Sequence, residues 1–349
     1  MHKHLVAALA VIALGCGGGG GADVSNKPVV ALIMKSLANE FFVTMADGAR
    51  AHHAEHEDDY DLIVNGIRNE NDIAQQVALV EQMIARGVDA IVLAPADSRA
   101  LVPVARRAQE AGIVVVNVDN KFDDDVLAQA GAKVPFVGPD NREGARKVGD
   151  RLAEELEPGS EVAIIGGTPT AFNAQQRQAG FEEAMREAGM NIVSVQSGYW
   201  EQEPGNNVAA AMLREYPNLK ALLCANDNMA LGAAAAVRQS GKQDDVLVVG
   251  FDNIEAVHPL LRSGRMLATA DQHPDRLAVF GIELALEMLR GESQGEDRDT
   301  PVELVTAAHL SGEALVEGAG ERVSGGADDT TAGAGGDTVA VADKADSVR

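Results

Sequence analysis

Short apolar runs alternate with amphipathic segments from Pro28 onward. In the amphipathic segments, such as 73–87 (IAQQVALVEQMIARG), apolar residues recur at steps of three and four, which predicts helices. Glycines follow several of these segments, at 87, 112, 189 and 241, as is common at helix ends. The apolar runs predict ten strands, at 29–34, 60–66, 89–95, 112–120, 135–141, 161–167, 191–198, 221–227, 246–253 and 266–272.

Continuous apolar strands that alternate with helices indicate parallel sheets covered by helices on both faces. The predicted fold class is therefore α/β, with right-handed crossovers between strands. Ten strands are too many for one modest sheet, and about half of them precede residue 141. The chain is therefore predicted to form two doubly wound lobes.

The N-terminus has the pattern of an export signal over residues 1–15. A short basic region precedes apolar residues 5–14, and this stretch is too short to span a bilayer. Ala-Leu-Gly-Cys, ending at Cys16, resembles the lipobox of bacterial lipoproteins, although Ala13 stands where that motif usually has Leu. We expect an exported chain that is lipidated at Cys16 and carries a flexible tether over 16–27. A plain cleaved signal is the alternative.

Composition narrows the classes of partner. The formal net charge of -24 argues against nucleic acid, because binding to a phosphate backbone depends on clustered Lys and Arg. Cys224 is the only cysteine besides Cys16 and lies in an apolar run, where a thiol serves as inert packing. Beyond about Leu310 the chain is rich in Gly, Ala, Asp, Ser and Thr, which predicts disorder over 313–349.

Polar side chains follow six of the predicted strands. Ligands of open parallel sheets bind beyond the carboxyl ends of the strands, so these residues are candidates for a site. They are Lys35, Asp119, Asn120, Asp140, Asn141, Asn226, Asp227, Asp252, Asn253 and Gln272. Each Asp or Asn could instead cap the next helix, but Lys35 and Gln272 cap poorly and the pattern recurs in both halves. We therefore predict a shared polar cleft.

Carboxylates and amides with few cations favour a sugar as the ligand of this cleft. A sugar hydroxyl both donates and accepts hydrogen bonds, which Asp, Asn and Gln side chains can satisfy. Phosphate would instead need basic residues or a glycine-rich nest. Phe41, Phe42 and Trp200 are candidates for aromatic platforms against the apolar faces of a sugar ring.

Other chemistries have weaker signals. His52 and His56 are one helical turn apart, but no further metal ligand is apparent, so a solvated helix face is favoured. The segment GGTPTAFN (166–173) follows a strand but lacks the spacing of a phosphate-binding loop. No Ser/His/Asp grouping for nucleophilic catalysis is apparent in the sequence. Carboxylates across the cleft nevertheless leave a carbohydrate-processing enzyme as an alternative to a binding protein.

Six motifs, in order and at comparable spacing, resemble the ribose- and allose-binding branch of the periplasmic sugar-binding proteins of ABC importers. They are AxxMKSLANEFFVTMADGA (31–49), VNVDNK (116–121), NAQQRQAGF (173–181), CANDNMALGA (224–233), VLVVGFDN (246–253) and ATADQHP (268–274). The resemblance implies a type I periplasmic binding protein fold with three crossings between lobes, near Pro139, His273 and Pro301. One lobe would be 28–139 plus 273–300, and the other 140–272 plus 301–312.

The resemblance also implies ligand contacts from both lobes. They are Lys35, Asn39, Phe41, Phe42, Asp119 and Asn120 in the first lobe, and Asn141, Arg177, Trp200, Asn226, Asp252 and Gln272 in the second. Asn226 would contact the ligand while Asp227 caps the helix that follows. Ribose binders have a small hydroxyl residue at position 35 and Arg at position 120, whereas allose-type members share Lys35. These departures favour a hexose or a polyol over ribose.

The implied function is capture of one monosaccharide between the lobes, followed by delivery to an ABC transporter permease. The protein would act as a monomer without a cofactor or metal, in the periplasm or at the outer face of the membrane. Two alternatives remain: an exported carbohydrate-processing enzyme, and a sugar-sensing protein that reports to a chemoreceptor or kinase.

Overall fold

The computed structural model describes residues 27–311. The predicted export signal, Cys16 and all but the last residue of the tether lie outside these residues, as does the predicted tail over 313–349.

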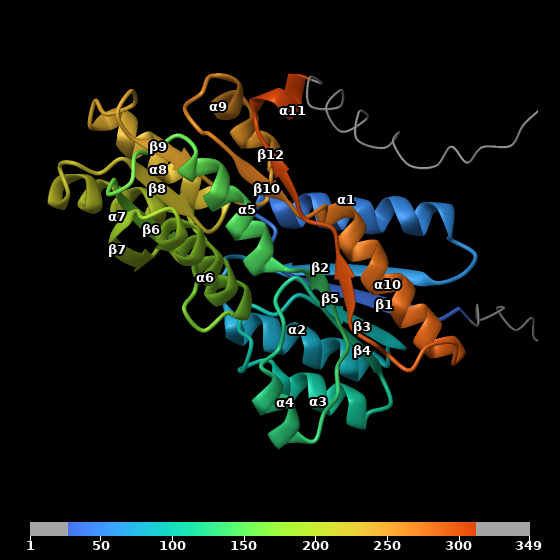
Figure 1. The fold of residues 1–349 in the computed structure, drawn as a ribbon. Coiled ribbons are helices and arrows are strands. Elements are labelled where there is room, and N and C mark those ends of the chain that lie inside the picture. The colour runs from blue at the N-terminus through green and yellow to red at the C-terminus, as the bar shows by residue number, and fades with distance from the viewer. Residues whose placement is uncertain (1–26, 312–349) are drawn as a thin grey trace, which may run out of the picture. The chain divides into compact units, whose positions relative to one another are not determined.

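Six parallel strands form the first sheet, in the order β11-β5-β4-β3-β1-β2 (Figure 1). Helices α1 and α10 pack together on one face, while a buried apolar cluster fills the other face under α2 and α3. The strands are β1 (Val29–Ser36), β2 (Asp61–Ile67), β3 (Ala90–Leu93), β4 (Val114–Val118), β5 (Phe136–Pro139) and β11 (Arg298–Thr300). The helices are α1 (Glu40–Glu55), α2 (Ile73–Arg86), α3 (Val102–Glu110), α4 (Asp124–Ala130) and α10 (Pro274–Arg290).

The second sheet is also parallel and has the order β7-β6-β8-β9. Helix α5 packs against α6, and α7 packs against α8. The α5–α6 contact is close enough to require glycine, because a Cβ at Gly180 would lie 2.2 Å from the carbonyl oxygen of Arg142. The strands are β6 (Glu161–Gly166), β7 (Asn191–Ser197), β8 (Ala221–Cys224) and β9 (Leu247–Val249); the helices are α5 (Asn141–Ala153), α6 (Phe172–Glu187), α7 (Gln202–Glu215) and α8 (Asp227–Gln239).

Short elements complete the described chain. Strands β10 (Thr269–Asp271) and β12 (Glu303–Val305) pair antiparallel, while β11 joins the first sheet beside β5. The remaining elements are the 3₁₀ helix η1 (Glu255–Val257), α9 (His258–Arg262) and α11 (Ala307–Ser311). The sequence analysis missed β11 and β12, because three-residue strands of mixed polarity carry no apolar run.

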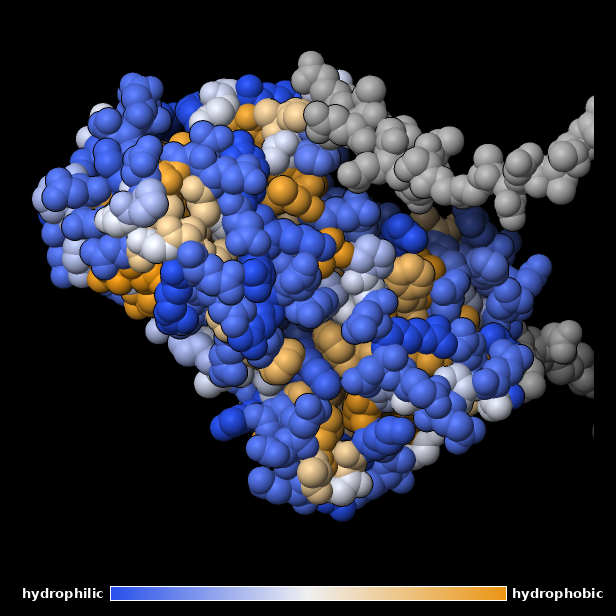
Figure 2. Space-filling view, viewed as in Figure 1, coloured by the Kyte–Doolittle hydropathy of each residue, from blue (hydrophilic) through white to orange (hydrophobic). Residues whose placement is uncertain are grey.

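The predicted α/β class with two parallel sheets is confirmed, and each of the ten predicted runs contains a strand. The helix-ending glycines were also placed correctly: Gly87 and Gly241, for example, have φ of 71° and 68°. The face in Figure 2 is mostly hydrophilic, with smaller apolar areas between the polar residues. Within residues 27–311, none of the helices combines the length and apolarity that crossing a membrane requires.

Candidate binding site

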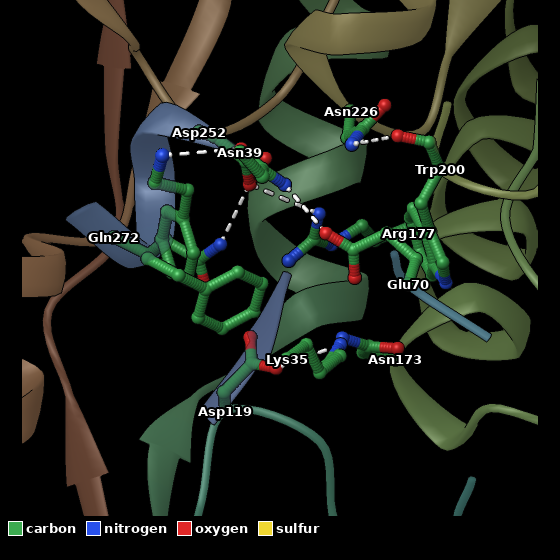
Figure 3. A pocket seen from close by; sticks show the side chains of 12 residues that line it. Lys35, Asn39, Glu70, Asp119, Asn173, Arg177, Trp200, Asn226, Asp252 and Gln272 are labelled. Atoms are coloured by element: carbon green, nitrogen blue, oxygen red, sulfur yellow. Dashed lines mark hydrogen bonds and ion pairs between the residues drawn. The ribbon is translucent and has the colours of Figure 1, made fainter. Parts of the chain in front are cut away.

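One pocket gathers most of the predicted contact residues (Figure 3). Its lining comes from strand ends, turns and helices near the carboxyl ends of both parallel sheets, and from the segment after β10. About 240 Å³ of free space lies among these side chains, part of it open to solvent. The lining residues are Lys35, Asn39, Phe41, Phe42, Glu70, Asp119, Asn173, Arg177, Trp200, Asn226, Asp252 and Gln272.

Three of these residues have backbone conformations that are uncommon for any residue except glycine. The φ angles of Asp119, Trp200 and Asp252 are 63°, 70° and 118°. Each residue lies in the turn between a strand and the following element. Strained turns persist where the surrounding structure holds them, and they are enriched at functional sites. Here they aim three side chains at one pocket.

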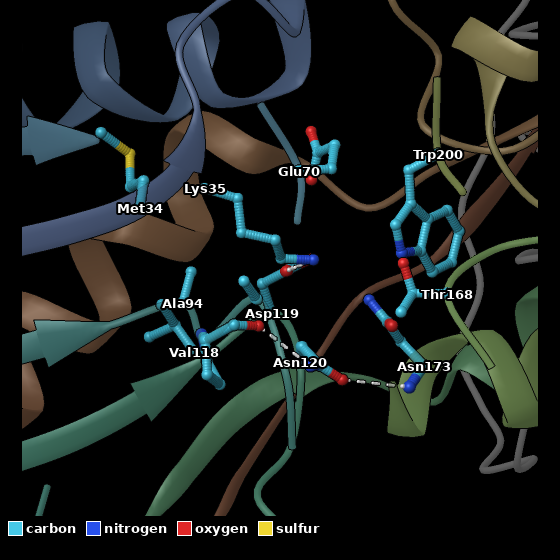
Figure 4. A network of polar contacts seen from close by, with 12 residues as sticks. Met34, Lys35, Glu70, Ala94, Val118, Asp119, Asn120, Thr168, Asn173 and Trp200 are labelled. Carbon is cyan, nitrogen blue, oxygen red and sulfur yellow. Dashed lines mark hydrogen bonds and ion pairs between the residues drawn. The ribbon is translucent and has the colours of Figure 1, made fainter. Parts of the chain in front are cut away.

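A buried ion pair forms the side of the pocket next to the first sheet (Figure 4). The Lys35 ammonium, at the end of β1, lies 2.9 Å from Asp119 Oδ2, beyond β4. Both side chains are almost fully buried. The ammonium also lies 5.4 Å from the ring centroid of Phe42 and 5.7 Å from that of Trp200, within range of a cation–π interaction.

Arg177 is the centre of a hydrogen-bond network on the side next to the second sheet. Its Nε donates to Asn141 Oδ1 at 2.8 Å, and its Nη1 donates to the carbonyl oxygen of Ala225 at 2.9 Å. The same Nη1 donates to Asp252 Oδ1 at 3.2 Å, and this oxygen also accepts from Gln272 Nε2 at 2.7 Å. The network therefore fixes Asp252 from two directions.

Burial shifts the pKa values of the charged groups in this network, and each charge opposes the shift of its partner. Desolvation raises the pKa of Asp252 to about 6, although the Arg177 guanidinium opposes the shift. Desolvation also lowers the pKa of Arg177, opposed by Asp252 and Asp119. The guanidinium carbon lies 3.7 Å from the ring centroid of Phe251, so an aromatic face covers the cation.

Glu70 is a pocket residue that the sequence analysis missed. It lies between β2 and α2, and its Oε1 accepts from Asn39 Nδ2 at 2.9 Å. Asn39 is also the N-cap of α1, where its Oδ1 accepts from the N–H of Phe41. Desolvation raises the pKa of Glu70 to about 7. The polar run at 68–72, after the second predicted strand, was the signal that could have identified it.

Asn120 and Asn141 do not line the pocket, although both were predicted as ligand contacts. The Asn120 side chain is hydrogen-bonded to the protein backbone. Its Nδ2 donates to the carbonyl oxygen of Pro95, and its Oδ1 accepts from the N–H of Asn173. Asn141 holds the guanidinium of Arg177. Each therefore supports a neighbour that does line the pocket.

The roles of Asn226 and Asp227 differ from those predicted. Asn226 Oδ1 accepts from the N–H of Met229, so Asn226 both caps α8 and lines the pocket. Asp227 accepts instead from the N–H of Ile254 and the hydroxyl of Thr269. The prediction that Asp227 caps the helix was therefore wrong. Asp227 is buried, and desolvation raises its pKa well above the usual range.

Three buried polar atoms of the pocket have neither a hydrogen bond nor an ion pair within residues 27–311. They are the acceptors Asn173 Oδ1 and Gln272 Oε1 and the donor Trp200 Nε1. Unpaired buried polar atoms are rare in folded proteins and call for a specific explanation. Phe41 and Phe42, packed edge to face with centroids 5.0 Å apart, add aromatic surface to the same pocket. The arrangement is suited to a ligand with both hydroxyl groups and apolar faces.

The histidines at and just beyond the end of α1 form hydrogen bonds outside the pocket. His52 Nδ1 is 2.9 Å from the Tyr60 hydroxyl, and His53 Nε2 is 3.1 Å from the Tyr60 carbonyl oxygen. His56 Nδ1 lies 3.0 Å from Asp59 Oδ2. The ring nitrogens named here are therefore engaged within the protein.

The chain is similar in sequence and fold to sugar-binding proteins of transporters. A family model described as a periplasmic binding protein domain matches residues 30–293. The D-ribose/D-allose-binding protein of Pseudomonas aeruginosa is 59% identical over 290 residues, which cover 82% of this chain and 91% of that protein.

Two solved structures extend the similarity. An ABC transporter solute-binding protein of Burkholderia multivorans, with an unknown ligand drawn as α-D-erythrofuranose, has 60% identity and a TM-score of 0.79, covering 80% of this chain and all of that one. An ABC transporter periplasmic solute-binding protein of Actinobacillus succinogenes with bound D-allose has 36% identity and a TM-score of 0.78, covering 82% of this chain and all of that one.

Proposed function

This chain belongs to the periplasmic binding protein family, as a sugar-binding protein of ABC importers, and from that premise we propose that its pocket holds one aldose. D-allose and D-ribose are the first candidates, since relatives of this chain are named for them. The sugar would be bound, released unaltered and delivered to the importer's permease.

The main support for a sugar as the ligand comes from the unpaired polar atoms of the pocket. The three unpaired polar atoms of Asn173, Trp200 and Gln272 include two acceptors and one donor around a single pocket. A ring of sugar hydroxyls supplies donors and acceptors together, so it can satisfy all three at once. The aromatic rings of the pocket match the apolar C–H faces of the same molecule.

Asp119, Asp252 and Arg177 are proposed as the charged ligands of the sugar. A carboxylate that accepts from a hydroxyl makes a hydrogen bond roughly twice as strong as a neutral one. Asp119 acts from the first sheet and Asp252 from the second, so contact with both favours a closed arrangement of the two halves. Asn120 and Asn141 are assigned supporting roles in place of direct contact.

We also propose two lobes that move relative to each other. One consists of residues 28–139 plus 273–300, and the other of residues 140–272 plus 301–312. Hydrogen bonds between the two halves support a closed form. Thr168 Oγ1 donates to Asn71 Oδ1 at 2.8 Å, and the N–H of Phe172 donates to Ser98 Oγ at 2.9 Å. Opening would break these bonds, and sugar contacts to both halves would favour their formation.

The family is periplasmic, and we propose that lipid on Cys16 anchors the mature chain to a membrane facing that compartment. We also propose that the chain acts as a monomer without nucleic acid. Mass spectrometry of the N-terminal peptide from the membrane fraction tests the anchor, because an unmodified Cys16 or its removal contradicts it.

Calorimetric titration of the purified protein tests the ligand. D-allose and D-ribose serve as probes, with D-glucose and myo-inositol for comparison. Saturable binding with one site, and recovery of the unchanged sugar by NMR after long incubation, is the expected result. Chemical conversion of the sugar would support the enzyme alternative, and absence of binding to all four would remove the proposed ligand class.

A further inference from the structure

Glu70 differs from the other carboxylates of the pocket in its electrostatic partners. Its side chain is buried, and within residues 27–311 it forms no ion pair. The Lys35 ammonium pairs with Asp119, and the Arg177 guanidinium pairs with Asp252. Asn39 supplies the one hydrogen bond that the Glu70 carboxyl receives in this part of the chain.

The charges of the pocket lining do not balance while Glu70 is ionised. Two cations, Lys35 and Arg177, face three acidic side chains, Glu70, Asp119 and Asp252. A neutral sugar brings no charge that could compensate for the third carboxylate. Burying an unpaired carboxylate costs far more than burying a neutral carboxyl group, so the balanced state has a proton on Glu70.

We propose that Glu70 is a further sugar-contacting residue, which takes up a proton as the two halves close on the sugar. In the neutral state, Oε1 keeps the hydrogen bond from Asn39 while the protonated oxygen donates to a sugar oxygen. The carboxyl group then acts as a donor in a pocket otherwise rich in acceptors. The inference rests on the proposed sugar-binding function.

Closure itself brings negative charge to Glu70. The groups facing it are Lys35 from β1, Asn39 from α1, Asp119 beyond β4 and Glu201 at the start of α7. Glu201 belongs to the other half of the molecule, and its Oε1 accepts from the N–H of Glu70 at 3.1 Å. Burial is the largest cause that raises the pKa of Glu70 to about 7; Asp119 and Glu201 add to it, and Lys35 opposes it.

The sign of the pH dependence follows from this arrangement. In an open, hydrated form the pKa of Glu70 lies closer to that of an ordinary Glu, near 4.3. Between that value and about 7, closure takes up a proton, so sugar affinity falls as pH rises. The fall approaches roughly tenfold per pH unit in this window, and the affinity is independent of Glu70 ionisation above it.

Calorimetry with D-allose and D-ribose from pH 5 to 8.5, in buffers of different ionisation enthalpy, tests the proposal. Wild-type protein is expected to lose at least tenfold in affinity between pH 5.5 and 7.5, with net proton uptake on binding. Glu70→Gln is expected to bind with a flat pH profile, since the amide is neutral at every pH. Glu201→Gln, which removes a nearby charge but keeps the pocket lining, is expected to shift the pH window downward.

Two results would overturn the proposal while leaving sugar binding intact. One is wild-type affinity that does not change with pH. The other is a slope that persists in Glu70→Gln, which would assign the proton to Asp252, whose pKa is raised to about 6. Absence of sugar binding at every pH would contradict both proposals together. Carbon-13 NMR of the glutamate carboxyls in the sugar complex gives a second readout, and a Glu70 signal that titrates near pH 4 would also refute the assignment.

Discussion

Asp252 and Arg177 show how single residues determine this site. Both are almost fully buried, and each satisfies the other's charge at 3.2 Å. Removal of one partner from such a pair leaves an uncompensated buried charge, which is more damaging than the loss of the pair as a whole. The residues proposed to bind the sugar are therefore also expected to stabilise the fold.

Asp252→Ala is expected to weaken binding of the cognate sugar by about 2 kcal/mol or more, or roughly 30-fold, because hydroxyls and Arg177 both lose their acceptor. The variant should also unfold more easily, by about 3–5 kcal/mol. Calorimetry measures the first effect and denaturant unfolding the second. Asp123→Asn is the control, since Asp123 caps α4 outside the pocket and Asn also caps well. Unchanged affinity in Asp252→Ala would contradict its role.

Trp200 is the only tryptophan, so its emission reports on the pocket directly. Sugar binding is expected to change the intensity or wavelength of this emission. Trp200→Phe keeps an aromatic face but removes the unpaired Nε1 donor, and should weaken binding by about 1 kcal/mol. A flat fluorescence titration, with binding demonstrated by calorimetry, would exclude Trp200 from contact.

Helix starts supply several pocket residues, so local capping and ligand binding are coupled at the scale of the element. Asn39 caps α1 and Asn226 caps α8, and both side chains line the pocket. The first turn of each helix directs N–H groups toward the end where ligands bind in parallel α/β sheets. Each amide also donates to another pocket residue, Asn39 Nδ2 to Glu70 Oε1 at 2.9 Å and Asn226 Nδ2 to the carbonyl oxygen of Trp200 at 3.2 Å.

Substitutions at Asn226 separate these two functions. Asn226→Ala is expected to destabilise the protein by about 1 kcal/mol through loss of the α8 cap and to weaken sugar binding as well. Asn226→Asp should restore the α8 cap, because Asp caps as well as Asn, but not the affinity, because the amide that donates to the Trp200 carbonyl oxygen and to the sugar is lost. Asp123→Ala, which uncaps α4, should lose stability with unchanged affinity. Full affinity in Asn226→Asp would show that the amide does not contact sugar.

At the scale of the whole molecule, contacts outside the pocket also join the two proposed halves. Glu40, at the start of α1, accepts from the N–H groups of Glu255 at 2.6 Å and Ala256 at 3.4 Å, on the other half. Contacts of this kind shift the balance between open and closed forms without touching the ligand. Under the proposed closure, we therefore expect sugar affinity to depend on residues distant from the pocket.

Glu40→Ala is expected to lower sugar affinity roughly three- to tenfold by destabilising the closed form, in line with the loss of one or two surface hydrogen bonds. Small-angle scattering should show a smaller radius of gyration for the wild-type protein when sugar is added. The control for the affinity of Glu40→Ala is Glu110→Ala, which removes an exposed ion pair with Arg106 on α3. A radius that does not respond to bound sugar would contradict the closure mechanism.

The sequence by itself determined the two-sheet architecture and most of the candidate lining. Apolar runs specify buried parallel strands, and such strands end at a common edge, so residues like Lys35, Asp119 and Asp252 meet there for topological reasons. The family resemblance added Asn39, at the start of α1, and Arg177, within α6, where strand ends give no signal.

Only the tertiary structure decided the direction of each side chain in the turns. Asp119 and Asn120 are adjacent, but the left-handed backbone at Asp119 sends its carboxylate into the pocket while the Asn120 amide turns to Pro95. Glu70 enters the pocket from three residues beyond its strand. Its proton affinity depends on groups from separate elements, such as Lys35 and Glu201. These outcomes depend on distances between elements far apart in the chain, which local pattern does not encode.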